Sequence, residues 1–169
     1  MSNDHEVVGR GSSAGRQVRS GLADIVHRVG IKASSPDGTY DALATRDGLA
    51  AWCTSDTQGE SAVGETIRVR FGERGGFEMK VLELEPSRRV LWEVVGGPAE
   101  WIGTQVRFEL RQHDGHTIVL FAHQGWREPI EFMHQCSTKW AIFLMSLKSL
   151  VETGKGQPWP NDVQISDWH

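Results

Sequence analysis

The sequence predicts an α+β domain in which an antiparallel sheet of about six strands packs against one long C-terminal helix. Two short helical patterns follow a first β-branched segment, five further segments alternate apolar and polar side chains, and a helically spaced apolar stripe comes last. The 169 residues, of which 38% are hydrophobic and 24% charged, suit one domain with one core. We therefore expect a single folded unit over residues 22–154.

The first strand and the two short helices are predicted from local signals. Residues 22–33 are rich in β-branched side chains, which favours a strand. Ser34–Asp37 then offers side chains that cap a helix and a Pro that tolerates its first turn. Apolar spacing up to Trp52 fits one or two short helices, with Thr45–Gly48 as a turn or a new N-cap between them. Trp52 is expected to anchor this helix pair to the sheet.

Five more strands are predicted after a polar loop at Thr54–Ala62. Each has apolar residues at every second position, as in a half-buried strand, and turn residues such as Gly, Pro or Asp separate them. The predicted segments are 66–71, 77–85, 90–94, 101–110 and 117–124.

The apolar period becomes helical from Pro129 to about Thr153. Gly154 and Gly156 are expected to end this helix, and two prolines further on prevent it from resuming. The remaining residues are expected to form tails outside the domain, disordered over 1–21 and extended over 155–169. The stripe that should face the sheet consists of Phe132, Cys136, Trp140, Phe143, Leu144, Leu147, Leu150 and Val151.

Charge and motif content exclude several classes of function. The net charge of −4 and a pI near 6.0, without a run of Lys or Arg, argue against nucleic acid as a partner. Cys53 and Cys136 lie far apart and outside any CxxC pair, so we expect free thiols in a reducing compartment. No metal-ligand spacing and no phosphate-binding loop occurs, which predicts no metal and no cofactor. With no apolar run of signal or membrane-spanning length, we expect no membrane span and a cytoplasmic location.

Four segments in this order resemble a known family. Tyr40–Trp52, Leu82–Val90, Gly115–Gly125 and Trp140–Leu150 are similar to signatures of the activator of heat-shock protein 90 ATPase homologue family, which belongs to the START-like (SRPBCC, helix-grip) superfamily. The likeness covers about Ala33–Val151. It implies a curved sheet that grips the C-terminal helix and leaves an internal apolar cavity.

The strand alternation and this resemblance together give candidate ligand-binding residues on the concave face and the helix. Trp92 and Trp140 are the strongest candidates, because an indole offers a stacking face and a hydrogen-bond donor. For most of the others, packing as core is the favoured alternative. The candidates are Trp52, Val69, Phe71, Trp92, Phe108, Phe121, His123, Trp140, Phe143, Leu144 and Leu147.

His123 is the one candidate for catalysis. It shares the phase of Val119 and Phe121, which would aim its imidazole into the cavity near the mouth, where it could exchange a proton near neutral pH. No carboxylate or nucleophilic side chain lies at a sequence spacing from His123 that would indicate a catalytic partner. We therefore favour the alternative that His123 hydrogen-bonds a neighbour at the rim of the sheet.

Three functions are compatible with these observations. The first is binding of a small hydrophobic molecule, such as a lipid, a polyketide or an aromatic compound, in the cavity. The second is an enzyme of the cyclase or hydrolase type, which would require His123, Glu78 or Arg107 to act. The third, implied by the family's name, is co-regulation of a chaperone ATPase or another protein interaction. The apolar helix stripe is also compatible with a homodimer.

Overall fold

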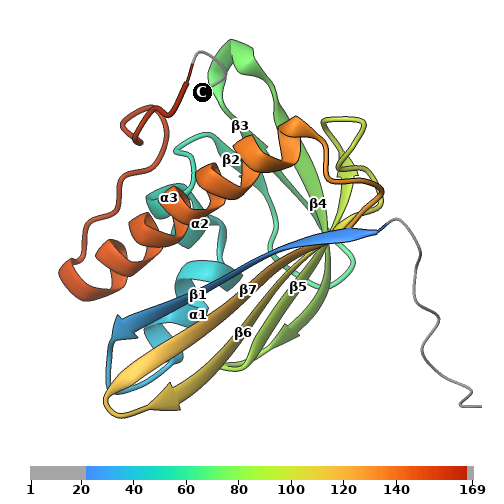
Figure 1. Cartoon of the computed structure of the whole chain (residues 1–169). Helices are drawn as coiled ribbons and strands as arrows, with labels where there is room; N and C mark the ends of the chain where they lie inside the picture. Colours follow the sequence, from blue (N-terminus) through green and yellow to red (C-terminus); the bar gives the residue numbers. More distant parts are fainter. Residues whose placement is uncertain (1–21, 167–169) are drawn as a thin grey trace, which may run out of the picture.

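A computed structural model describes residues 22–166 of the chain, and its element order agrees with the order predicted from the sequence. Figure 1 shows these elements along the chain. They are β1 (Ala23–Lys32), α1 (Asp37–Ala44), α2 (Arg46–Trp52), β2 (Thr57–Gly59), β3 (Thr66–Arg70), the 3-10 turn η1 (Gly72–Arg74), β4 (Gly76–Glu85), β5 (Arg89–Gly96), β6 (Gln105–His113), β7 (His116–Trp126) and α3 (Glu131–Thr153).

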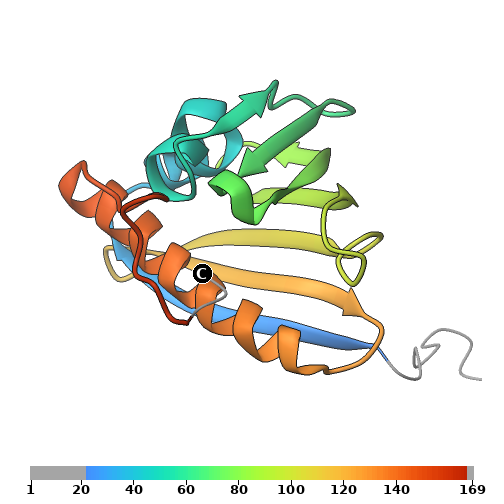
Figure 2. The same cartoon turned by 90° about the horizontal axis from the view of Figure 1, so that it is seen from above.

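The strands form one antiparallel sheet in the order β1-β7-β6-β5-β4-β3-β2, which confirms the α+β fold class. The sheet has seven strands because β2, inside the expected polar loop, pairs with β3 at one edge. A three-residue strand is too short to show an alternation, so this strand was missed. The sheet curves, and α3 packs against its concave side (Figure 2).

Thr45 separates the two short helices, as its position in the sequence predicted. It has an extended backbone, and its hydroxyl accepts a hydrogen bond from the N–H of Gly48 at 3.0 Å, which satisfies a free donor in the first turn of α2. At the end of α2, the Trp52 indole donates to the carbonyl of Ala42 at 2.8 Å and packs edge-on against Phe108. Trp52 thereby ties both helices to the sheet.

The concave face carries the core, and strand register decides which side chains share it. Val106 lies opposite His123, and Phe108 lies opposite Phe121, so β6 and β7 present these four side chains on the same side. The helix α3 covers them with a buried stripe that includes Leu144 and Leu147. It ends at Gly154, which has the left-handed φ of +83° and donates its N–H to the carbonyl of Leu150.

The segment after α3 returns along the helix toward its N-terminal half (Figure 1). The N–H of Gln157 donates to the hydroxyl of Ser146 at 2.7 Å, and Trp159 forms an isolated bridge with Thr54. Further on, Asp162 is buried against α3. Residues 155–166 thus lie against the domain without forming a helix or a strand, whereas 1–21 and 167–169 lie outside the described residues.

Candidate functional site

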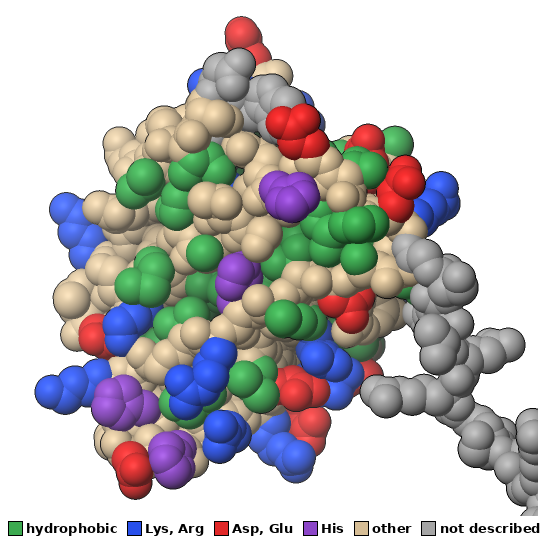
Figure 3. All heavy atoms as spheres, in the orientation of Figure 1, with side chains coloured by type: hydrophobic (Ala, Val, Ile, Leu, Met, Phe, Trp, Pro, Cys, Tyr) green, Lys and Arg blue, Asp and Glu red, His purple; other side chains and the backbone are tan. Residues whose placement is uncertain are grey.

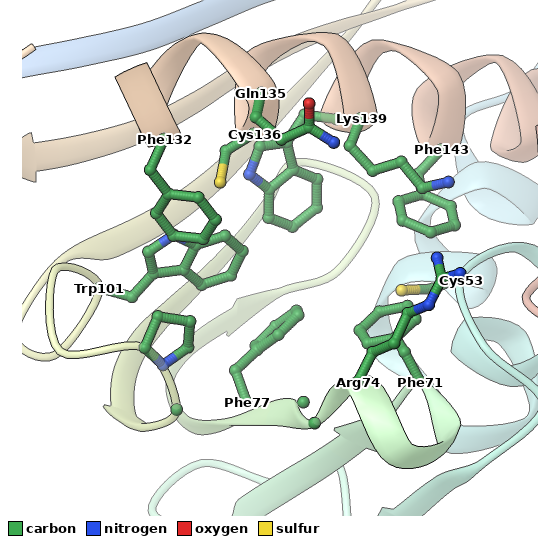
Figure 4. Close-up of a pocket in the computed structure, with 15 residues that line it drawn as sticks. Cys53, Phe71, Arg74, Phe77, Trp101, Phe132, Gln135, Cys136, Lys139 and Phe143 are labelled. Atoms are coloured by element: carbon green, nitrogen blue, oxygen red, sulfur yellow. The ribbon is translucent and has the colours of Figure 1, made fainter. Parts of the chain in front are cut away.

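A pocket of about 420 Å³ lies between the N-terminal half of α3 and the sheet edge where β3 leads into β4. Figure 4 shows α3 along one side, η1 and the start of β4 opposite, and the loop that carries Trp101 at one end. Six aromatic side chains, drawn from four separate parts of the chain, form most of its wall: Phe71, Phe77, Trp101, Phe132, Trp140 and Phe143. The rest of the lining consists of Cys53, Arg74, Gly75, Gly76, Gly97, Pro98, Gln135, Cys136 and Lys139.

The aromatic side chains of the wall pack against one another. The Trp101 and Trp140 rings are nearly parallel, at 16°, with centroids 6.0 Å apart, and Phe77 lies 4.7 Å from Trp101. At the other end, Phe71 contacts both Phe77 and Phe143 at about 6 Å. A flat apolar molecule would meet ring faces and edges on several sides.

Gly97 allows the loop after β5 to approach the aromatic wall. Its φ is +123°, a region that L side chains rarely adopt, and an added Cβ would lie 2.8 Å from the Cβ of Phe77. Any larger residue would push Phe77 into the pocket or move the loop away from it.

His123 lies behind this wall and connects two of its indoles. The Trp140 Nε1–H donates to His123 Nδ1 at 3.1 Å, and an indole nitrogen can only donate, so the imidazole proton is on Nε2. Nε2 donates to the Thr104 hydroxyl at 2.8 Å, and this hydroxyl donates to the carbonyl of Trp101 at 2.5 Å. The chain of hydrogen bonds fixes the relative positions of Trp101 and Trp140.

Burial keeps one histidine and two cysteines near the aromatic wall neutral. It lowers the pKa of His123, which is 0% exposed, to about 3. Burial also raises the pKa of the Cys136 thiol to about 12, and burial, with Asp162 as a further cause, raises that of Cys53 to about 12. At neutral pH the imidazole is therefore uncharged and both thiols are protonated, which makes them poor nucleophiles.

Polar atoms gather at the end of the pocket near η1. The ammonium group of Lys139 lies 2.5 Å from a carboxylate oxygen of Asp162 and donates to the carbonyl of Val163 at 2.7 Å. The Arg74 guanidinium donates to the side-chain oxygen of Gln164 at 3.0 Å. In Figure 4, Arg74 and Lys139 extend toward each other from opposite sides of the pocket.

Three of the eleven candidates from the sequence line this pocket: Phe71, Trp140 and Phe143. His123 adjoins it through Trp140 without lining it. The other seven pack in the core, where their side chains are 0–2% exposed: Trp52, Val69, Trp92, Phe108, Phe121, Leu144 and Leu147.

Glu78 and Arg107, the other residues considered for an enzyme, do not line the pocket. Glu78 pairs with Arg68 at 3.1 Å, and Arg107 lies 3.7 Å from Glu109.

Sequence reasoning missed most of the lining. Phe77 had a usable signal, since it pairs with Val69 across β3 and β4 and so shares the concave face with it. Trp101 was expected at the start of a strand but lies in the turn before β6, where no periodicity marks it. Lys139 was off the apolar stripe of α3, and its burial depends on the segment around Asp162.

Residues 22–166 offer neither a group of metal ligands nor a helix that could cross a membrane. In this part of the chain no group of three or more His, Cys, Asp or Glu side chains is arranged to hold a metal ion. Over the same residues, no helix combines the length and apolar character needed to cross a membrane.

The helix gripped by a curved antiparallel sheet, with a pocket beside it, defines a START-like domain. The family model described as "Activator of Hsp90 ATPase homolog 1-like protein" matches residues 33–152, and the chain belongs to this family. This confirms the resemblance identified in the sequence. No curated protein matches the chain.

One solved structure supports the assignment through sequence identity and fold, and two others through the fold alone. The Aha1 dimer of Colwellia psychrerythraea, a solution structure, is 47% identical, with a TM-score of 0.73 over 79% of this chain and 99% of that chain. A Chromobacterium violaceum protein is 20% identical, with a TM-score of 0.62 over 77% of this chain and 98% of its own. An Enterococcus faecalis protein is 18% identical, with a TM-score of 0.65 over 86% of this chain and 79% of its own. The last two show the fold alone.

Proposed function

We propose that this domain binds a small hydrophobic molecule in the pocket beside α3. The observation that carries the proposal is a space of about 420 Å³ walled by six aromatic side chains, within the size range of small-molecule sites in proteins. A protein interior normally closes such space by packing. Here the concave face beneath is filled, whereas the pocket stays open.

The chemistry of the wall supports binding rather than turnover. Among residues 22–166, the histidine that contacts the wall, His123, is neutral, fully buried and engaged through both ring nitrogens. Both thiols in the lining are held protonated by burial. The hydrogen bonds of His123 hold Trp140 in place before a ligand arrives, which lowers the entropy cost of binding.

Titration with N-phenyl-1-naphthylamine, a neutral dye that brightens in apolar sites, tests the proposal. We expect saturable binding that Gln135→Phe weakens by about tenfold, because the new ring would occupy the pocket from α3. Thr138→Phe is the matched control, since Thr138 lies on the same helix but is exposed, and it should leave the affinity unchanged.

A lack of saturable dye binding, or equal affinities for the two variants, would contradict the binding proposal. Native mass spectrometry of gently purified protein, before and after organic extraction, would complement the titration. An extra mass that extraction removes would give the chemical class of a natural ligand. A bound chaperone in such preparations would instead favour the co-regulator function.

We also propose that the chain forms a homodimer, because the 47% identical Colwellia relative was solved as a dimer. Exposed apolar side chains such as Val26 on the edge strand β1 and Met145 on α3 are available for a contact. On the face shown in Figure 3, hydrophobic atoms occur in several groups separated by polar ones. Sedimentation velocity should give twice the 18.8 kDa chain mass, and a purely monomeric species at high concentration would contradict the dimer.

A further inference from the structure

The charged side chains that line the pocket are all of one sign. Arg74 and Lys139 line it, and no Asp or Glu of residues 22–166 does, although the chain as a whole carries a net charge of −4. Both cations lie at the same end, opposite Trp101 and Phe132 (Figure 4). The pocket thus has an aromatic end and a cationic end.

Lys139 is a cation held largely out of water. Its side chain is 10% exposed, its Nζ lies 2.5 Å from Asp162, and the same nitrogen lies 5.2 Å above the ring of Phe143. Lys139 lines the pocket, whereas Asp162 is not among the lining residues. An anion in the pocket would meet Lys139 where the dielectric is low and electrostatic attraction is strong.

Arg74 supplies a second cation, which forms no ion pair with the described residues 22–166. Its contact is the neutral amide of Gln164, and within residues 22–166 no carboxylate lies within 4.0 Å of its guanidinium. A guanidinium has five N–H donors in a planar fork that matches a carboxylate. Within residues 22–166, Lys139 therefore has a carboxylate partner at this end of the pocket, whereas the partner of Arg74 is neutral.

We propose that the ligand of this pocket is an amphipathic monoanion, with a flat apolar body and one carboxylate or similar acidic group. The acidic group lies between Arg74 and Lys139, and the body extends along Phe77 and Trp140 toward Trp101. This inference rests on the proposed function and specifies the chemical class of ligand for the same site.

A matched pair of probes separates charge from shape. Naphthalene-2-carboxylic acid, ionised at neutral pH, and naphthalene-2-carboxamide, its neutral counterpart, would each compete against bound N-phenyl-1-naphthylamine. We expect the acid to bind about fivefold more tightly at low salt. We expect this preference to shrink at about 0.5 M salt, because screening weakens the attraction of a partly exposed Arg.

Two variants are expected to change the affinity for the acid in opposite directions. Arg74→Gln, at an exposed position, should reduce the affinity for the acid to that for the amide. Asp162→Asn should raise the affinity for the acid by about threefold, because the ligand no longer competes with a carboxylate for Lys139. Arg88→Gln, in the turn at the far end of β4, is the control and should change neither affinity.

The outcomes for the two proposals are distinguishable. If N-phenyl-1-naphthylamine does not bind, the proposed function fails. If the dye binds but the acid and the amide displace it equally well, or Arg74→Gln preserves the preference for the acid, the monoanion inference is overturned and the proposed function stands. If Asp162→Asn fails to fold, the Arg74→Gln result still decides.

Discussion

Acidification from pH 6.5 toward 3 is expected to destabilise the folded domain through His123 by about 1.4 kcal/mol per pH unit. Burial lowers the pKa of this imidazole from 6.5 to about 3, because the apolar surroundings cannot solvate a charged ring. Below pH 6.5 the unfolded chain therefore binds a proton that the folded chain does not. The contribution of the neutral His123 to the free energy of unfolding is fully present above pH 6.5 and is lost as the pH falls toward the pKa of the folded state.

Urea unfolding curves at a series of pH values, followed by circular dichroism, would measure this slope. His123→Gln removes the titrating group and should flatten the dependence between pH 6.5 and 4.5, at a cost in stability at neutral pH. His113→Gln changes an exposed histidine and should leave the slope as in the parent protein. Parallel slopes for the parent protein and His123→Gln would show that His123 is protonated in the folded state and would refute the assignment.

Trp52→Ala is expected to lower the free energy of unfolding by about 3–5 kcal/mol, the range for deleting a large buried aromatic side chain. Trp52 is 0% exposed, and its loss also leaves the carbonyl of Ala42 without its indole donor. Trp52→Phe keeps most of the apolar contact with Phe108 and should cost roughly 1–2 kcal/mol.

The same variants separate core from ligand contact. Trp52 was a candidate ligand residue, but it does not line the pocket. Below their melting temperatures both variants should therefore bind N-phenyl-1-naphthylamine as tightly as the parent protein. A large loss of affinity in Trp52→Phe, with stability little changed, would place Trp52 in the binding site instead.

The sequence predicted the concave face well because alternation is a strong local signal. Phe108, Phe121 and His123 lie on the same side of the sheet, as their phase required. Strand β2 escaped detection because three residues at an edge carry too little pattern. Periodicity says which way a side chain faces, and this was sufficient to identify most of the core.

Periodicity could not show where a pocket stays open beside the packed concave face. That depends on how loops close over it, and the turn that carries Trp101 and the backbone at Gly97 have no repeating pattern. It also depends on the segment that brings Asp162 to Lys139, which are far from adjacent in the sequence. His123 illustrates both parts: its side was predictable, but its burial next to Trp101 and Trp126 was not.

The separation between the packed concave face and the pocket beside it has a consequence for divergence among related proteins. Several lining residues, such as Arg74, Pro98 and Gln135, come from loops or from partly exposed helix positions. Replacing them disturbs few core contacts and changes stability little. The shape and the charge of the pocket can therefore change between related proteins while the fold stays the same. A change in the lining of the pocket needs only a few substitutions at these positions.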